Sequence, residues 1–111
     1  MLDQFADKHR PLAERFGPYW PPRKPEARAA VHAVWPQRLW PIVDCIVSRE
    51  AGWYWRAHND VYPDNPYGLF QINQLAWRLP DPVRLFDPEF NARVAYGLYR
   101  RAGFAPWRGG R

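Results

Sequence analysis

The distribution of proline is the feature that most limits how this chain can fold. Its 111 residues include 13 prolines, and many of them gather in GPYWPPRKP at residues 17–25 and in LPDPVRLFDP at residues 79–88. Because proline has no backbone N–H and disrupts helices and sheets, both stretches are expected to be connectors. A chain of this length forms one domain, near the lower size limit for an adequate core.

The segment WPIVDCIVSRE predicts a helix that ends on a carboxylate. Pro41 is tolerated in a first helical turn. Ile42, Ile46 and Glu50 recur at intervals of four residues, so they share one stripe of the helix. Gly52 follows directly and is expected to end the helix.

Two further helices are expected, one over residues 26–34 and a stronger one from Asp87 to about residue 102. Asp87 is a suitable N-cap, Pro88 suits the first helical position, and Gly103 stops the helix. The expected apolar stripe of the later helix consists of Phe90, Val94, Leu98 and Ala102, and Ala95 and Tyr99 widen it.

Residues 65–73, NPYGLFQIN, combine turn-forming residues with apolar side chains and two amides, Gln71 and Asn73. This content predicts a short extended segment or a small hairpin. The fold class expected is therefore α+β and predominantly helical. Residues 1–39 are expected to form an N-terminal arm that serves either as a packing flange or as a docking element, and residues 40–111 the main domain.

Composition indicates two kinds of partner. The chain has seven Trp, six Tyr and six Phe, which exceeds what packing alone usually requires, so some rings are expected to line a groove and stack on sugars or bases. A formal charge of +5 favours an anionic partner, either nucleic acid or a polymer such as the bacterial wall. The charge is spread along the chain without a basic block, so charge alone is a weak clue to the partner.

The single cysteine, Cys45, excludes an internal disulfide and a cysteine-ligated zinc site. Its apolar neighbours predict a small core side chain. His9, His32 and His58 do not have the spacing of metal ligands, so no metal site is expected. No apolar run approaches the ~18 residues of a membrane span. The charged first twenty residues lack an apolar signal core, so we expect no Sec-type export signal.

Glu50 is the candidate for acid chemistry. The negative end of a helix dipole disfavours a carboxylate there, and burial beside apolar neighbours disfavours its charge further. Both effects favour a protonated acid near neutral pH, and such a group can donate a proton to a leaving oxygen. The alternative is a solvated glutamate at a frayed helix end.

A segment YGLFQIN that follows a glutamate at the end of an apolar helix resembles the lysozyme superfamily, especially lytic transglycosylases and phage lysins. SREAGW is similar to their Ser/Cys-Glu-Ser-Gly core, with Ala51 where the family usually has serine. HNDVYPDNPYGLFQIN resembles a run in actinobacterial and phage members, and LFDPEFNARVAYGLYRRAGFAPW resembles their closing helix and terminal aromatic motif. Small resuscitation-promoting-factor domains share this plan. The resemblance covers about residues 40–107 and leaves residues 1–39 outside.

The resemblance implies a lysozyme-like catalytic domain over residues 40–111, in which the hairpin or extended segment lines a glycan cleft opposite Glu50. It implies cleavage of the MurNAc–GlcNAc β-1,4 bond of peptidoglycan, with Glu50 as general acid and then base, and without metal or cofactor. The substrate-binding residues that it implies are Asn59, Tyr67, Gly68, Gln71, Asn73 and Tyr99.

Several of these roles have alternatives. Gln71 either hydrogen-bonds an N-acetyl group or holds the cleft wall, and Asn73 either contacts sugar or caps a brief helix over residues 74–78. Gly68 is expected to let the backbone approach the sugar. Tyr99, or less closely Tyr96, matches a family tyrosine that faces the glutamate, and packing within the helix is its alternative.

The second carboxylate of hen-egg-type lysozymes is replaced here by Pro66. Asp60 and Asp64 lie in the same loop, where turn formation is their expected role. The chain therefore resembles the one-carboxylate members, whose nucleophile is either water or the muramoyl 6-hydroxyl.

Without an export signal, the resemblance implies delivery by a phage particle, a holin or a secretion machine, with phage tail or secretion-machine proteins docked on residues 1–39. The alternative function is a noncatalytic virion or wall-binding module that keeps the fold, which Ala51 and Pro66 favour mildly. A nucleic-acid binder, supported only by charge and aromatic content, is a further alternative that strongly salt-dependent DNA binding would favour.

Overall fold

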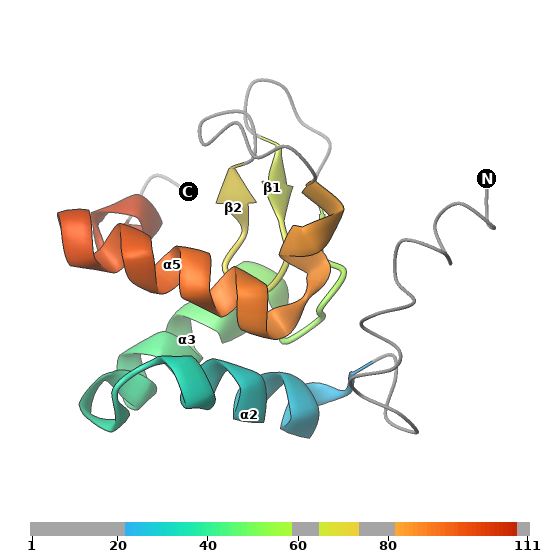
Figure 1. The fold of residues 1–111 in the computed structure, drawn as a ribbon, viewed down its shortest axis with the longest axis horizontal. Helices are drawn as coiled ribbons and strands as arrows, with labels where there is room; N and C mark the ends of the chain where they lie inside the picture. Colours follow the sequence, from blue (N-terminus) through green and yellow to red (C-terminus); the bar gives the residue numbers. More distant parts are fainter. Residues whose placement is uncertain (1–21, 59–64, 74–81, 109–111) are drawn as a thin grey trace, which may run out of the picture.

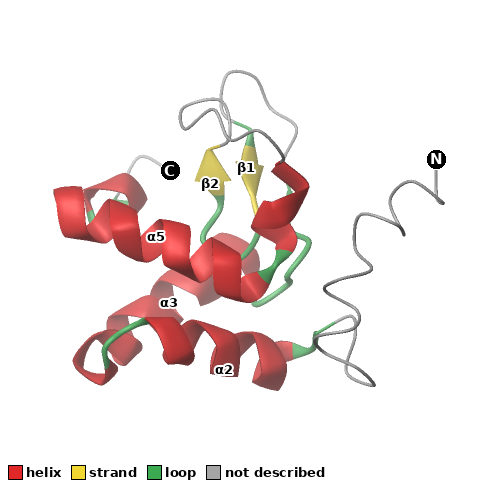
Figure 2. Ribbon diagram, in the orientation of Figure 1, coloured by secondary structure: helices red, strands yellow, loops and turns green. Residues whose placement is uncertain are grey.

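The computed structural model describes residues 22–58, 65–73 and 82–108. Within these ranges the chain is mainly helical and carries one two-stranded antiparallel sheet, so the expected α+β, predominantly helical class is confirmed (Figure 2). The predicted brief helix over residues 74–78 lies outside the described residues. The elements are α2 (Lys24–Val34), η2 (Gln37–Leu39), α3 (Trp40–Ala51), β1 (Pro66–Tyr67), β2 (Ile72–Asn73), η3 (Pro82–Phe86), α5 (Pro88–Ala102) and η4 (Ala105–Trp107).

Helix α2 begins two residues earlier than predicted, because its first turn is capped. The Glu26 carboxylate accepts a hydrogen bond from the Arg23 backbone N–H at 3.0 Å and another from the Arg23 side chain at 3.0 Å. The hydrogen bond from the Arg23 side chain lowers the pKa of Glu26 from its usual value. Pro25 lies in this first turn, where its missing N–H costs no helical hydrogen bond.

The predicted end of α3 and the predicted start of α5 are confirmed. Gly52 follows α3 in the left-handed conformation, with φ of 58°, and its N–H donates to the Ser48 carbonyl. Asp87 caps α5, since its carboxylate accepts from the backbone N–H of Glu89 at 3.0 Å and also from that of Phe90.

The buried face of α3 is rotated from the predicted stripe. Val43, Ile46 and Val47 are buried, at spacings of three and four residues. Ile42 is 47% exposed and Cys45 is also exposed, so the expectation that these two side chains belong to the core was wrong. One face of this helix is therefore apolar and open to solvent.

The core face of α5 also differs from the predicted stripe. Leu98 and Ala95 are buried as expected, but Phe90 and Val94 are only partly buried and Ala102 is exposed. The face that packs on the core centres instead on small side chains and one amide, because α5 packs closely against α2 and the hairpin. Its buried residues are Pro88, Asn91, Ala92, Ala95 and Leu98.

Part of the proposed N-terminal arm belongs to the core. Of residues 1–39 the structure describes 22–39. This described part contains α2, which packs along α5. In Figure 1, α2 lies at one side of the molecule, the hairpin at the other, and α3 and α5 between them. The side chains from this part of the arm that belong to the hydrophobic core are Ala27, Val31, Trp35 and Leu39.

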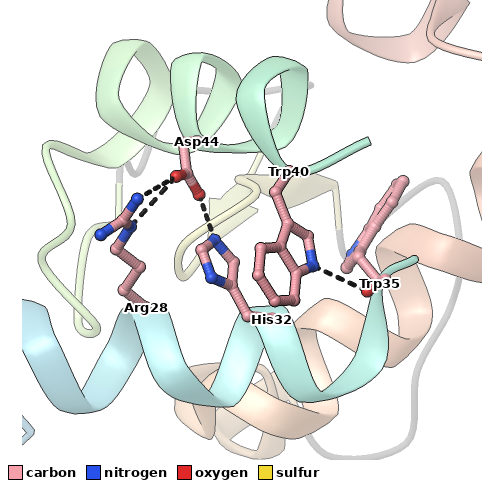
Figure 3. Close-up of polar contacts among 5 residues, drawn as sticks. All are labelled: Arg28, His32, Trp35, Trp40 and Asp44. Atoms are coloured by element: carbon pink, nitrogen blue, oxygen red, sulfur yellow. Dashed lines mark hydrogen bonds and ion pairs between the residues drawn. The ribbon is translucent and has the colours of Figure 1, made fainter. Parts of the chain in front are cut away.

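A polar cluster joins α2 to α3 (Figure 3). One Asp44 carboxylate oxygen lies 2.9 Å from the Arg28 guanidinium, and the other lies 2.7 Å from His32 Nε2. The His32 ring stacks on Trp40 with centroids 4.0 Å apart, and the Trp40 indole N–H donates to the Trp35 carbonyl at 2.8 Å. This set fixes the crossing of the two helices.

The hairpin inserts its turn into the core. β1 and β2 pair in antiparallel register with Tyr67 opposite Ile72. Residues 68–71 form the turn, in which the Gln71 N–H donates to the Gly68 carbonyl at 3.0 Å. Leu69 and Phe70 at this turn have no exposed surface. A turn is usually exposed, so its backbone polar groups require partners within the protein.

Asn91 of α5 supplies these partners. Its Oδ1 accepts from the Phe70 backbone N–H at 2.9 Å, and its Nδ2 donates to the carbonyls of Tyr67 and Leu85, each at 2.9 Å. The side chain is completely buried. One amide therefore fixes the hairpin, η3 and α5 in place.

We predict that Asn91→Ala lowers the free energy of unfolding by about 3 kcal/mol or more, because it leaves three buried backbone groups without partners. Urea denaturation followed by tryptophan fluorescence measures this change. The matched control is Arg93→Ala, which removes an exposed ion pair with Glu89 on the same helix and is expected to cost less than about 1 kcal/mol. Equal effects of the two substitutions would contradict the role of Asn91.

Candidate active site

Glu50 lies in the last turn of α3 and is largely enclosed. The buried residues Val47 and Ile46 lie three and four positions before Glu50, so Glu50 shares their face of the helix. Only 9% of its side-chain surface is exposed. The alternative of a solvated glutamate at a frayed end is therefore wrong.

Arg49 connects Glu50 to the end of the chain. Its guanidinium lies 3.5 Å from the Glu50 carboxylate and also donates a hydrogen bond to the Trp107 carbonyl. The Trp107 indole N–H in turn donates to the Phe70 carbonyl at 2.9 Å. A continuous series of contacts thus runs from the carboxylate of Glu50 to the buried turn of the hairpin.

A second connection joins the hairpin to the loop that follows α3. The Ala57 carbonyl accepts from the Gly68 backbone N–H at 2.7 Å and from Gln71 Nε2 at 3.1 Å. Trp53 and Trp55 of the same loop are buried, so the loop is packed. The hairpin therefore has two connections to the region around Glu50: one through Trp107 to Arg49, and one to Ala57 in the loop after α3.

Gln71 holds the turn of the hairpin, and both predicted roles, contact with an N-acetyl group and support of a cleft wall, stay predictions. It is 8% exposed, and its Nε2 donates both to the Ala57 carbonyl and to the Gly68 carbonyl at 2.9 Å. Its backbone has φ of 51°, a conformation that costs free energy for a residue with a side chain. The two side-chain hydrogen bonds offset that cost, and this leaves the turn in a single conformation.

Gly68 is required by the protein itself. It is buried with φ of 78°, and a β-carbon at this position would clash with the Leu85 carbonyl and the Asn91 side chain. These contacts explain the glycine without a ligand. The close approach of a sugar to Gly68 stays a prediction.

Tyr67 belongs to an aromatic cluster at the edge of the hairpin. Its ring stacks on His58 with centroids 4.1 Å apart and lies 5.4 Å from that of Phe86. His58 Nδ1 lies 2.9 Å from the Pro66 carbonyl, and Asn65 Nδ2 donates to the Tyr67 hydroxyl at 3.4 Å. The half-buried Tyr67 ring is thus held in place, with a sugar contact still a prediction.

Tyr99 packs in the core. Its ring lies 5.4 Å from Trp35, 4.6 Å from Phe104 and 6.1 Å from Tyr96. The Tyr99 ring therefore has the packing role that was given as its alternative. The predicted contact between its hydroxyl and Glu50 stays a prediction.

The remaining predicted residues are only partly placed. Asn73 ends β2, where it pairs with Pro66, and its proposed capping of residues 74–78 cannot be followed beyond the described residues. Asn59, Asp60 and Asp64 lie outside the described residues.

Cavities among the described residues include two that adjoin α3. The first, of about 510 Å³, lies between α3 and the C-terminal segment and is lined by Pro41, Ile42, Cys45, Ile46, Arg49, Phe104, Trp107 and Arg108. The second, of about 400 Å³, lies between α2 and α3 and is lined by Lys24, Arg28, Asp44, Cys45, Ser48 and Trp53. Glu50 lines neither, so a glycan cleft between Glu50 and Gly68 stays a prediction.

Within residues 22–58, 65–73 and 82–108, no three His, Cys, Asp or Glu side chains gather into a set that could hold a metal ion. No helix in these ranges is long and apolar enough to cross a membrane. Comparisons with protein-family models, with curated proteins and with solved structures found no match for this chain. The resemblance to the lysozyme superfamily therefore rests on its motifs.

Sequence reasoning missed three residues that position the candidate site: Asn91, Arg49 and Trp107. Asn91 lies one helical turn before Ala95 and so shares its core-facing side of α5. An amide at a core-facing position indicates a buried hydrogen bond. That signal was available in the sequence, but its partners on the hairpin were not.

We predict that Gly68→Ala destabilises the protein by about 3 kcal/mol or more, because it adds a clash with Leu85 and Asn91 to the unfavourable positive φ. Gly52→Ala is the matched control, since Gly52 has a similar φ of 58° but no atom within 4 Å of the added carbon. It is expected to cost only about 1 kcal/mol. Thermal or urea denaturation of both variants measures the difference, and similar losses would show that packing at Gly68 is unimportant.

Proposed function

We propose that this chain is a peptidoglycan-cleaving enzyme of the lysozyme-like type, a muramidase or lytic transglycosylase that cuts the MurNAc–GlcNAc β-1,4 bond. One observation carries the proposal: Glu50 is 9% exposed at the end of α3, in contact with Arg49, which also binds the Trp107 carbonyl. Through Trp107 this carboxylate is tied to the segment whose sequence resembles a glycan-binding wall.

The proposed chemistry requires a carboxyl group that can change protonation state without moving. Glu50 protonates the glycosidic oxygen as the bond breaks and then accepts a proton from the incoming nucleophile. Enclosure by α3 and contact with Arg49 limit the positions that the carboxyl can adopt. Such a restriction supports acid–base catalysis because proton transfer depends on geometry.

The proposed mechanism uses one carboxylate. Pro66 is buried in β1, where its carbonyl lies 2.9 Å from His58 Nδ1, and it offers no side-chain group for catalysis. The nucleophile is either water or the muramoyl 6-hydroxyl, which would close a 1,6-anhydro ring. Neither route requires a covalent intermediate with the protein.

A noncatalytic virion or wall-binding module is the second candidate. Ala51 stands where the resembled family usually has serine. Pro66 stands where hen-egg-type members have aspartate and the actinobacterial and phage members have serine. The loss of these two hydroxyl groups favours the noncatalytic alternative. Such a module would bind sacculi without releasing fragments. Release of fragments therefore separates the two candidates.

We predict that Glu50→Gln lowers the release of soluble fragments from purified sacculi by about 100- to 10,000-fold, because the amide cannot donate the proton. Glu89→Gln, at a more exposed glutamate of α5, is the matched control and should release fragments at the wild-type rate. Denaturation curves must show that both variants stay folded. Near wild-type release by Glu50→Gln would exclude Glu50 as the acid.

We also predict that Asp60→Asn and Asp64→Asn each retain most of the activity, because the proposed mechanism needs no second carboxylate. The same release assay measures both variants. A folded variant that lost activity as completely as Glu50→Gln would identify a catalytic aspartate and replace the one-carboxylate mechanism.

A further inference from the structure

The cavity of about 510 Å³ beside α3 is a surface groove lined by mostly apolar side chains and two arginines. Ile42 is 47% exposed in it, and Cys45 lies beside it, also exposed. Arg49 and Arg108 contribute the charged groups, and none of the described residues that line it is acidic. An exposed apolar surface with two guanidinium groups favours a ligand that carries both methyl groups and carboxylates.

We propose that this groove binds the acidic stem peptide that muramic acid carries in peptidoglycan. The inference rests on the proposed function, and it names the part of the substrate that the groove would recognise. A stem peptide contains alanine methyl groups, which suit the apolar lining, and free carboxylates, which suit Arg49 and Arg108. Carboxylate–arginine pairs are charge-assisted and directional, so they also orient the peptide.

The position of the groove relative to Glu50 supports this occupant. Arg49 lines the groove, and its guanidinium lies 3.5 Å from the Glu50 carboxylate. The Arg49 side chain alone therefore separates the groove from Glu50. The stem peptide is attached to the muramic acid ring next to the bond that Glu50 would cleave. A glycan bound at Glu50 would therefore bring its peptide to this side of α3.

Charge also argues against a second copy of the chain as the occupant. A two-fold interface through this groove would bring the arginines of one copy near those of the other. Like charges at an interface oppose association. An acidic ligand instead neutralises Arg49 and Arg108, in keeping with the formal charge of +5.

Cys45 gives a direct readout of the groove, because it is the only cysteine of the chain and lies in the groove lining. The experiment measures the rate at which N-ethylmaleimide alkylates Cys45 in the full chain. The probe is the disaccharide GlcNAc–MurNAc carrying its stem peptide, which lacks the bond proposed for cleavage. The comparison probe is the same disaccharide without peptide.

The expected result is protection by the peptide-bearing probe alone. At about ten times its Kd the alkylation rate should fall roughly tenfold, while the peptide-free disaccharide leaves the rate nearly unchanged. Equal protection by both probes, or protection by neither, would overturn the proposal.

Arg108→Glu tests the charged part of the groove lining, and Arg38→Glu is its control, because Arg38 is an exposed arginine on η2. Arg108→Glu should weaken the peptide-bearing probe by about tenfold or more, and Arg38→Glu should not. Cys45 lines both cavities, whereas Arg108 lines only the groove. Weaker probe binding in Arg108→Glu therefore shows that the probe protects Cys45 from the groove and not from the second cavity. Equal Kd values for the two variants would contradict it.

The two proposals fail in different ways. Cleavage of sacculi without peptide-dependent protection of Cys45 would leave the proposed function standing and remove the peptide groove. Peptide-dependent protection without any cleavage would keep the groove and make the chain a wall-binding module.

Discussion

A buried turn imposes the constraint on which the rest of the fold depends. Residues 68–71 reverse the chain inside the core, where water cannot satisfy their backbone groups. The partners come from distant parts of the sequence: Asn91 binds the Phe70 N–H, and Trp107 binds the Phe70 carbonyl. The hairpin, α5 and the C-terminal segment must therefore assemble together.

The same hydrogen bonds position the candidate site. The Trp107 ring donates a hydrogen bond to the hairpin, and the Trp107 carbonyl accepts one from Arg49. The end of α3 is therefore fixed relative to the turn. Glu50 is held through Arg49. Stability and the proposed chemistry thus depend on the same residues, and a substitution at Trp107 is expected to affect both.

The helices could be predicted from local signals. Asp87 and Gly103 define the limits of α5, and Gly52 ends α3, because caps and glycine act within one turn of the chain. The faces of these helices were predicted less well. Ile42 and Cys45 are exposed because the neighbours of α3 decide which side is buried, and those neighbours come from distant sequence.

The candidate site was predicted only in part for the same reason. The enclosure of Glu50 follows from its place in the helical repeat, and the hairpin was expected from its turn residues. The requirement for glycine at position 68 was attributed to a ligand, whereas Leu85 and Asn91 account for it. Contacts between segments far apart in the sequence leave no local pattern, so Arg49 and Trp107 were not identified in advance.

Mass spectrometry of purified sacculi after incubation with the full chain tests the central claim most directly. We expect soluble muropeptides whose new ends are muramic acid, either as a reducing sugar or as the 1,6-anhydro form, and the ratio of the two identifies the nucleophile. Intact sacculi, or new reducing ends at GlcNAc, would contradict cleavage of the MurNAc–GlcNAc bond by Glu50.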